Sequence, residues 1–205
     1  MSPGATFERV YRELKRRLGE NAWPPGTPIE PALVGPELGA SITPVRDALH
    51  RLVGERLVEA PGHNGFRVPR PGEAALRDLY AWNGRVLALA VSRMRFEAGG
   101  AGGKPPEPVD VATATAGLFL RITRAAGSDE HVRVVAQLND RLASCRQVEP
   151  RALDEVAGEQ QALHLLLDAG ERTELNRALT RYHRRRIAAV PRILALLSAN
   201  ESSPG

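Results

Sequence analysis

Residues 37–70 decide how the N-terminal part of this chain folds, and they read E-L-G-A-S-I-T-P-V-R-D-A-L-H-R-L-V-G-E-R-L-V-E-A-P-G-H-N-G-F-R-V-P-R. A Ser-x-Thr-Pro sequence separates two apolar segments, and it has the composition of a helix start. Ser41 is a suitable N-cap, and Pro44 is tolerated in a first turn. Behind them an apolar residue recurs every three or four positions, at Val45, Ala48, Leu49 and Leu52. This spacing predicts a helix over 41–53 with one buried face.

A hairpin is expected directly after this helix. Residues 57–60 and 66–68 have the composition of short strands, and P-G-H-N-G (61–65) joins them. Asn-Gly is the strongest short-range hairpin signal. Upstream, apolar spacing predicts a helix from about Thr6 to Leu18 and a short helix near 34–38, where Pro36 is tolerable only in a first turn. Helices followed at once by a hairpin predict a winged helix-turn-helix.

The remainder of the 205-residue chain is expected to be helical. Pro69 and Pro71-Gly72 mark a boundary, and helical segments are predicted at roughly 76–94, 109–126, 129–146, 151–169 and 172–198. The predicted helices at 76–94 and 109–126 are separated by a flexible stretch, G-G-A-G-G-K-P-P-E-P at 99–108. The predicted fold is mainly α, with a winged helix-turn-helix (α+β) domain at 1–70 and an all-helical bundle at 71–205.

Composition excludes several classes of protein. The single cysteine, Cys145, cannot form an intrachain disulfide, and this fits a cytoplasmic protein. No apolar run reaches the roughly 18 residues of a membrane span. No nucleophile elbow, phosphate loop, Cys/His pair or HExxH motif is present, so we do not expect an enzyme. The net charge of +4 only mildly favours a polyanionic partner.

The polar face of the 41–53 helix carries the candidate DNA contacts. Arg46 has the geometry for a bidentate contact with guanine or for a phosphate contact. Ser41, Thr43 and Pro44 lie at the helix N-terminus, where an anion is favoured. In the expected wing, Gly65 allows the backbone to approach a duplex closely. The other candidate wing contacts are His63, Asn64 and Arg67.

The segment from Phe7 to Val68 resembles the N-terminal domain of GntR-family bacterial transcription regulators. P-P-G-T-P-I (24–29) resembles the family's P-G-x-x-L, and L-G-A-S-I-T-P-V-R-D-A-L (38–49) resembles its L-G-V-S-R-T-P-V-R-E-A-L. G-F-R-V (65–68) resembles its G-x-x-V wing, and L-R-D-L-Y (76–80) followed only by helices resembles the FadR-like branch. The resemblance implies a homodimer on a palindromic double-stranded DNA operator, with a helical domain that senses a small carboxylate, often beside a metal.

The expected DNA-reading surface departs from the family at several positions. Ala32 and Ile42 stand where the family commonly has arginines that help to read DNA, and Asn64 stands where arginine is frequent. Arg46 is the one usual reading arginine that remains, so the operator should differ from the family's common one. Arg56 stands where the family has glycine at the helix end, and Gly54 is expected to supply the left-handed turn instead.

The helical domain has lost most of the family's metal ligands. The resemblance aligns Ala116 with an Asp, Leu120 with a His and Gln160 with another His, and only His183 matches. We therefore expect no metal and no cofactor, unless His164 joins His183. A pocket lined by Asn83, Thr115, Gln160 and His183 is expected to be less charged than the family's, and to take an effector less charged than a dicarboxylate, or none.

Two interpretations of the protein's function remain open. The first is a dimeric DNA-binding transcription regulator. The second is a winged-helix protein-interaction factor that has lost sequence-specific reading and has no effector. The basic run R-Y-H-R-R-R (181–186) either lies in solvent or contributes arginines to a pocket anion or a nearby phosphate.

Overall fold

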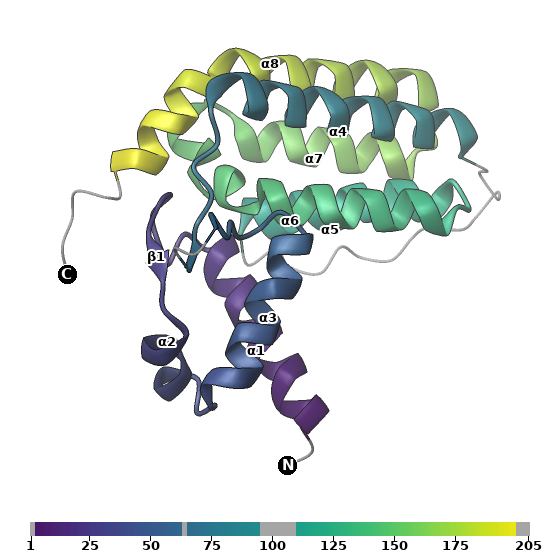
Figure 1. Ribbon diagram of the computed structural model, residues 1–205. Helices are drawn as coiled ribbons and strands as arrows, with labels where there is room; N and C mark the ends of the chain where they lie inside the picture. Colours follow the sequence, from purple (N-terminus) through teal and green to yellow (C-terminus); the bar gives the residue numbers. More distant parts are fainter. Residues whose placement is uncertain (1–2, 63–64, 95–109, 200–205) are drawn as a thin grey trace. The chain divides into compact units, whose positions relative to one another are not determined.

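The computed structural model describes residues 3–62, 65–94 and 110–199. The chain forms two compact units, one made of the first 71 residues together with the C-terminal end from Leu197, and one that spans Gly72–Leu196 (Figure 1). No helix within the described ranges is long and apolar enough to cross a membrane.

The first unit contains three helices, α1 (Pro3–Gly19), α2 (Pro31–Glu37) and α3 (Ile42–Gly54). The buried face of α3 is the predicted one, Val45, Ala48, Leu49 and Leu52. It packs against α1 in a core that also includes Val10 and Leu14. α2 is short, as expected, but it begins at Pro31 and contains Pro36 in its last turn rather than its first. At that position the missing N–H removes one helix hydrogen bond without breaking the helix.

The wing differs from the predicted hairpin. β2 (Phe66–Arg67) was expected, but it pairs antiparallel with β1 (Pro28–Ile29), a strand that the sequence did not predict. The predicted 57–60 strand is reduced to a single bridge between Glu59 and Arg67. Two more backbone bonds, from the Gly26 N–H to the Val68 carbonyl and from the Val68 N–H to the Thr27 carbonyl, extend the new pairing.

The end of α3 explains why the 57–60 strand is so short. The Leu57 N–H donates to the Leu52 carbonyl and the Arg56 N–H to the Val53 carbonyl, which is a Schellman C-cap. This cap needs a left-handed residue, and Arg56 supplies it with φ of 60°. The prediction that Gly54 would take this role was wrong, because Gly54 is still helical.

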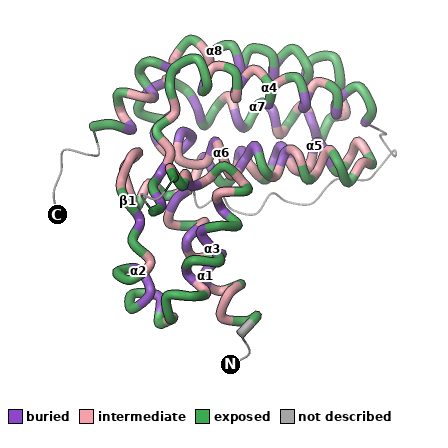
Figure 2. The backbone as a smooth tube through the Cα atoms, in the orientation of Figure 1, coloured by how far each residue is buried: buried purple, intermediate pink, exposed green. Residues whose placement is uncertain are grey.

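The second unit is a five-helix bundle of α4 (Glu73–Arg93), α5 (Val111–Ala125), α6 (Asp129–Ala152), α7 (Val156–Asp168) and α8 (Arg172–Ala199). α6 continues past the expected end near 146, and Pro150 lies in its last turn. Figure 1 shows α8 running beside α4, and the Arg77 Nη1 to Ile187 carbonyl hydrogen bond of 2.6 Å joins them. Figure 2 shows buried positions recurring along each helix, which together enclose the core around Phe119 and Tyr182.

Candidate nucleic-acid interface and buried polar cluster

The outer face of α3 carries an unpaired cation. Ser41, Thr43 and Arg46 are exposed at the beginning of the helix, and Pro44 beside them is partly buried. Arg46 has no hydrogen bond or ion pair with another described residue. Ser41 precedes α3 with an extended backbone and makes no side-chain capping bond. A guanidinium and two hydroxyls are therefore free to meet phosphate oxygens or base edges.

Neighbouring arginines are engaged within the protein. Arg51 bridges Glu8 at 3.2 Å and lies 4.1 Å from the Tyr11 ring centroid. Arg67, a predicted wing contact, donates to Glu59 at 2.9 Å. An exposed ion pair of this kind is weak, so Arg67 could exchange Glu59 for a phosphate group at little cost. The contrast with Arg46 makes α3 the strongest candidate for base reading.

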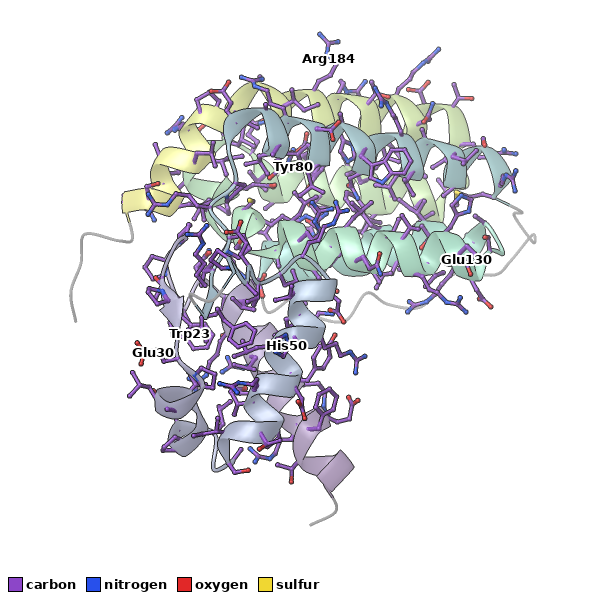
Figure 3. The ribbon with its side chains drawn as sticks, in the orientation of Figure 1. Trp23, Glu30, His50, Tyr80, Glu130 and Arg184 are labelled. Carbon is purple, nitrogen blue, oxygen red and sulfur yellow. The ribbon has the colours of Figure 1, made fainter. Side chains whose placement is uncertain are left out.

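The wing is described only in part. Gly65 adopts φ of +76°, and a Cβ placed on it would meet no atom within 4 Å, so its backbone is open to a large partner. His63 and Asn64 lie outside the described residues. His50, shown in Figure 3, packs its ring edge-on against Phe66 at 4.9 Å between centroids. This contact connects α3 to β2.

Apolar side chains are exposed on α2 and at the start of α3. Ile42 is 49% exposed and Leu33 65% exposed, and Ala32 is exposed as well. Ile42 is the first residue of α3. The two positions where the resemblance expects arginine therefore present methyl groups to solvent.

The four residues predicted to line the helical pocket are all buried. Asn83, Thr115, Gln160 and His183 are each no more than 8% exposed. His183 Nδ1 lies 2.7 Å from the Leu179 carbonyl and its Nε2 lies 2.8 Å from Asn83 Oδ1. Burial, followed by the charges of Arg146 and Arg186, lowers the His183 pKa to about 4. A neutral ring that donates from Nδ1 to Leu179 requires Asn83 to turn its amide nitrogen toward Nε2.

The bundle interior also contains ion pairs that the sequence analysis missed. Arg186 is fully buried and donates to Glu149 at 3.1 Å and to Glu159, which also meets Arg185 at 3.0 Å. The Tyr80 hydroxyl, within the bundle in Figure 3, donates to the same Glu149 at 2.9 Å. The basic run 181–186 is therefore divided, since Arg184 points to solvent and Arg186 is internal.

A second arginine is buried without a carboxylate. Arg146 is 1% exposed; its Nη1 donates to Asn139 Oδ1 at 2.8 Å and its guanidinium lies 5.0 Å from the Phe119 ring centroid. Within the described residues, its Nε and Nη2 have no hydrogen-bond partner, and neither do Gln160 Nε2 and the Tyr182 hydroxyl. The sequence analysis did not anticipate Arg146 and Arg186 at core positions of the bundle.

A signal for these residues was present in the sequence. Glu149 falls in register with Leu138, Leu142 and Cys145 on the apolar stripe of α6. A charged residue at a core position predicts a buried pair, because an isolated charge is too costly to bury.

The positions that correspond to the family's metal ligands do not fit a metal. Ala116 and Leu120 are partly buried and carry no ligand atom. His164 Nδ1 lies 3.1 Å from Arg121, and burial followed by that charge lowers its pKa. In the described part of the chain, no group of three or more His, Cys, Asp or Glu residues is arranged to hold a metal ion.

Comparisons with known proteins match the N-terminal part of the chain to bacterial regulators. The family model of bacterial regulatory proteins of the gntR family matches residues 6–68. The chain is 33% identical over 90 residues to the HTH-type transcriptional regulator McbR of Escherichia coli K12, covering 42% of this chain and 41% of McbR. It is 30% identical over 82 residues to the HTH-type transcriptional repressor GlaR of the same organism, covering 40% of this chain and 37% of GlaR. The chain thus spans about two fifths of these curated relatives, both of which are regulators rather than enzymes.

Solved structures share the fold over almost the whole chain. A GntR transcriptional regulator structure from Rhodococcus sp. RHA1 superposes with a TM-score of 0.77 at 18% identity, over 91% of this chain and 97% of that one. The structure of E. coli McbR/YncC gives a TM-score of 0.64 at 22% identity, over 94% and 98%. The mainly α fold, with an N-terminal winged helix-turn-helix and a helical C-terminal part, is therefore the fold of these regulators. Residues 6–68 of this chain thus match the family model of gntR bacterial regulatory proteins, and the two solved structures share its fold.

Proposed function

We propose that this protein is a DNA-binding transcription regulator of the FadR-like branch, in which a reading domain at 1–70 is controlled by a helical domain at 71–205. The observation that carries the proposal is Arg46, unpaired and exposed on the outer face of α3. The N-terminal part of such a helix enters the major groove. The family match over residues 6–68 supports the same role.

Ile42 gives the operator an expected feature. Its exposed methyl groups are at the first position of α3, close to where Arg46 would meet a base. In the major groove only thymine offers a methyl group to an apolar side chain. We therefore expect a thymine opposite Ile42 in each half-site, and uracil at that position should weaken binding several-fold by removing only that methyl.

A homodimer is expected to present two reading domains to a palindromic operator. On α4, Trp82 and Leu89 are each 49% exposed and lie seven residues apart on one face, which also carries the exposed Asp78 and Arg85. An exposed helix face on which large apolar side chains alternate with opposite charges suits a two-fold interface. Light scattering should give twice the chain mass at tens of micromolar, and Trp82→Glu should give a monomer.

An effector pocket is expected within the helical domain. Asn83, Thr115, Gln160 and His183 bring polar groups into its interior. Several buried polar atoms there have no partner among the described residues, and such atoms are normally satisfied by a ligand or by water.

The deciding experiment is selection of bound duplexes from a random-sequence pool with the full chain, followed by anisotropy titrations. Arg46→Ala should weaken the selected operator by about 1–3 kcal/mol and relax the preference at one position per half-site. Arg184→Ala removes an exposed arginine of α8 and should leave affinity within about two-fold. If no sequence is enriched, the second candidate function, a winged-helix protein-interaction factor, is favoured. The exposed Leu33 and Ile42 would then be part of its protein contact.

A further inference from the structure

A short turn, residues 38–41, joins α2 to α3 and sets the direction in which the reading helix begins (Figure 1). The Ala40 N–H donates back to the Gly35 carbonyl of α2 at 3.0 Å. Gly39 has the left-handed conformation, with φ of 55°. The chain therefore changes direction within the turn, and α3 starts directly after it at Ile42.

Arg9 of α1 binds this turn from outside the two helices that it joins. Its Nη1 donates to the Leu38 carbonyl at 2.6 Å and its Nη2 to the Gly39 carbonyl at 3.2 Å. One planar guanidinium thus holds two successive carbonyls, and the single ammonium of a lysine does not reproduce this geometry. The positive charge also lies at the C-terminal end of α2, where the helix dipole favours a cation.

The rest of α1 is a firm base for this contact. Val10 and Leu14 are fully buried in the core that also contains the apolar face of α3. Arg9 therefore ties the turn to the helix on which α3 packs. The beginning of α3 is held through its core face and through the turn that precedes it.

The candidate reading side chains follow the turn directly. Ser41 precedes the first residue of α3, Thr43 lies in its first turn, and Arg46 follows one turn later. Ser41 makes no side-chain capping bond, so the usual cap does not fix the start of the helix. Bidentate contacts with base edges depend on both distance and angle, so a small rotation of the turn is enough to disrupt them.

We propose that Arg9 is a positioning residue for DNA reading, which fixes the turn between α2 and α3 and thereby the register of Arg46 against the bases. The inference rests on the proposed function. In this role Arg9 contacts neither a base nor a phosphate. Its loss should therefore reduce sequence preference and leave the general attraction to the DNA backbone unchanged.

Arg12 offers a matched control. It is exposed and lines the same groove as Arg9, one turn further along α1. Its Nε donates to the Glu8 carbonyl of its own helix at 3.2 Å. Arg9→Met and Arg12→Met remove the same charge from the same helix, and only the first removes the two hydrogen bonds to the turn.

The test measures, by anisotropy, the affinity of the full chain for the selected operator and for a shuffled duplex of the same composition. Arg9→Met should weaken operator binding by about ten-fold through loss of the Arg46 contact, and Arg9→Lys nearly as much. Both should bind the shuffled duplex within about two-fold of the wild type, with an unchanged salt dependence. Arg12→Met should leave the ratio of the two affinities unchanged. Equal losses on both duplexes, with the salt slope reduced by about one, would assign Arg9 to a phosphate and overturn the proposal.

A double-mutant cycle tests the coupling to Arg46. In the Arg46→Ala background, Arg9→Met should weaken operator binding by less than about two-fold, because the contact that it positions is already absent. Hydrogen exchange without DNA reports on the turn itself: the Ala40 amide should exchange faster in Arg9→Met, and the core amide of Leu49 should not. If Arg9→Met does not fold, Arg9→Lys replaces it in both measurements. Additive losses in the cycle, or unchanged exchange at Ala40, overturn the proposal.

Failure of this proposal is distinguishable from failure of the proposed function. Operator selection by the wild type, with an unchanged ratio of operator to shuffled affinity in Arg9→Met, refutes the role of Arg9 and leaves the regulator standing. If the wild type selects no operator, the regulator is refuted, and with it the reading that Arg9 would position.

Discussion

Replacing Arg186 by methionine should destabilise the helical unit strongly. The guanidinium is fully buried, pairs with Glu149 at 3.1 Å and with Glu159, and lies 3.5 Å from the Tyr182 ring centroid. Without it, the Tyr80 hydroxyl is the one hydrogen-bond partner that the Glu149 carboxylate keeps among the described residues. Removing one partner of a buried ion pair costs about 3–5 kcal/mol. For a unit of this size that corresponds to a fall in Tm of roughly 10–20 °C.

The assay is urea unfolding followed by circular dichroism, with Arg184→Met as the control. Arg184 is exposed, so its replacement should change stability by less than about 0.5 kcal/mol. Adding Glu149→Gln to Arg186→Met removes the uncompensated charge and should recover part of the loss. A loss below about 1 kcal/mol for Arg186→Met, or no recovery in the double variant, would refute the view that this pair is buried and mutually dependent.

Three further predictions follow from particular residues. Arg56→Gly should raise stability by about 0.5–1 kcal/mol in urea titrations, because glycine takes the left-handed cap position without strain; a loss of stability would mean that the Arg56 side chain makes a compensating contact. Stability should fall as pH is lowered from 6.5 to about 4, since the unfolded chain binds a proton at His183 before the folded chain does; the His183 share totals about 3 kcal/mol and should be absent in His183→Gln. Purified protein should contain no stoichiometric zinc, nickel or manganese by elemental analysis, and a chelator should leave Tm unchanged; one metal per chain would show that His164 and His183 had been recruited as ligands.

Local signals in the sequence were sufficient for the reading helix. Ser41, Pro44 and the apolar stripe of α3 act within one helix, so their spacing alone predicts which face is buried. The wing was harder to predict. β2 pairs with Pro28–Ile29, which is almost forty residues earlier in the chain, and no periodicity in a two-residue strand can predict that partner. Arg56 was missed because a Schellman cap is set by backbone position, and the nearby Gly54 was the more favourable residue for it.

The buried polar cluster was only half predictable. Asn83, Thr115, Gln160 and His183 were located through resemblance, and all four are buried. Arg146, Glu149 and Arg186 come from two different helices, and each is an ordinary surface residue by type. Their role depends on which charges face each other across the bundle, and a one-dimensional pattern does not contain that information. A charged residue in the register of an apolar stripe is the available warning, and it occurs in both helices.

The central claim is that α3 reads a specific DNA sequence through Arg46. The most direct measurement compares operator selection by the wild-type chain and by Arg46→Ala at a stated salt concentration. The account predicts a palindromic sequence for the wild type, and for the variant the same sequence with one position per half-site made degenerate and binding weaker by about 1–3 kcal/mol. An identical selected sequence with unchanged affinity in Arg46→Ala would contradict it.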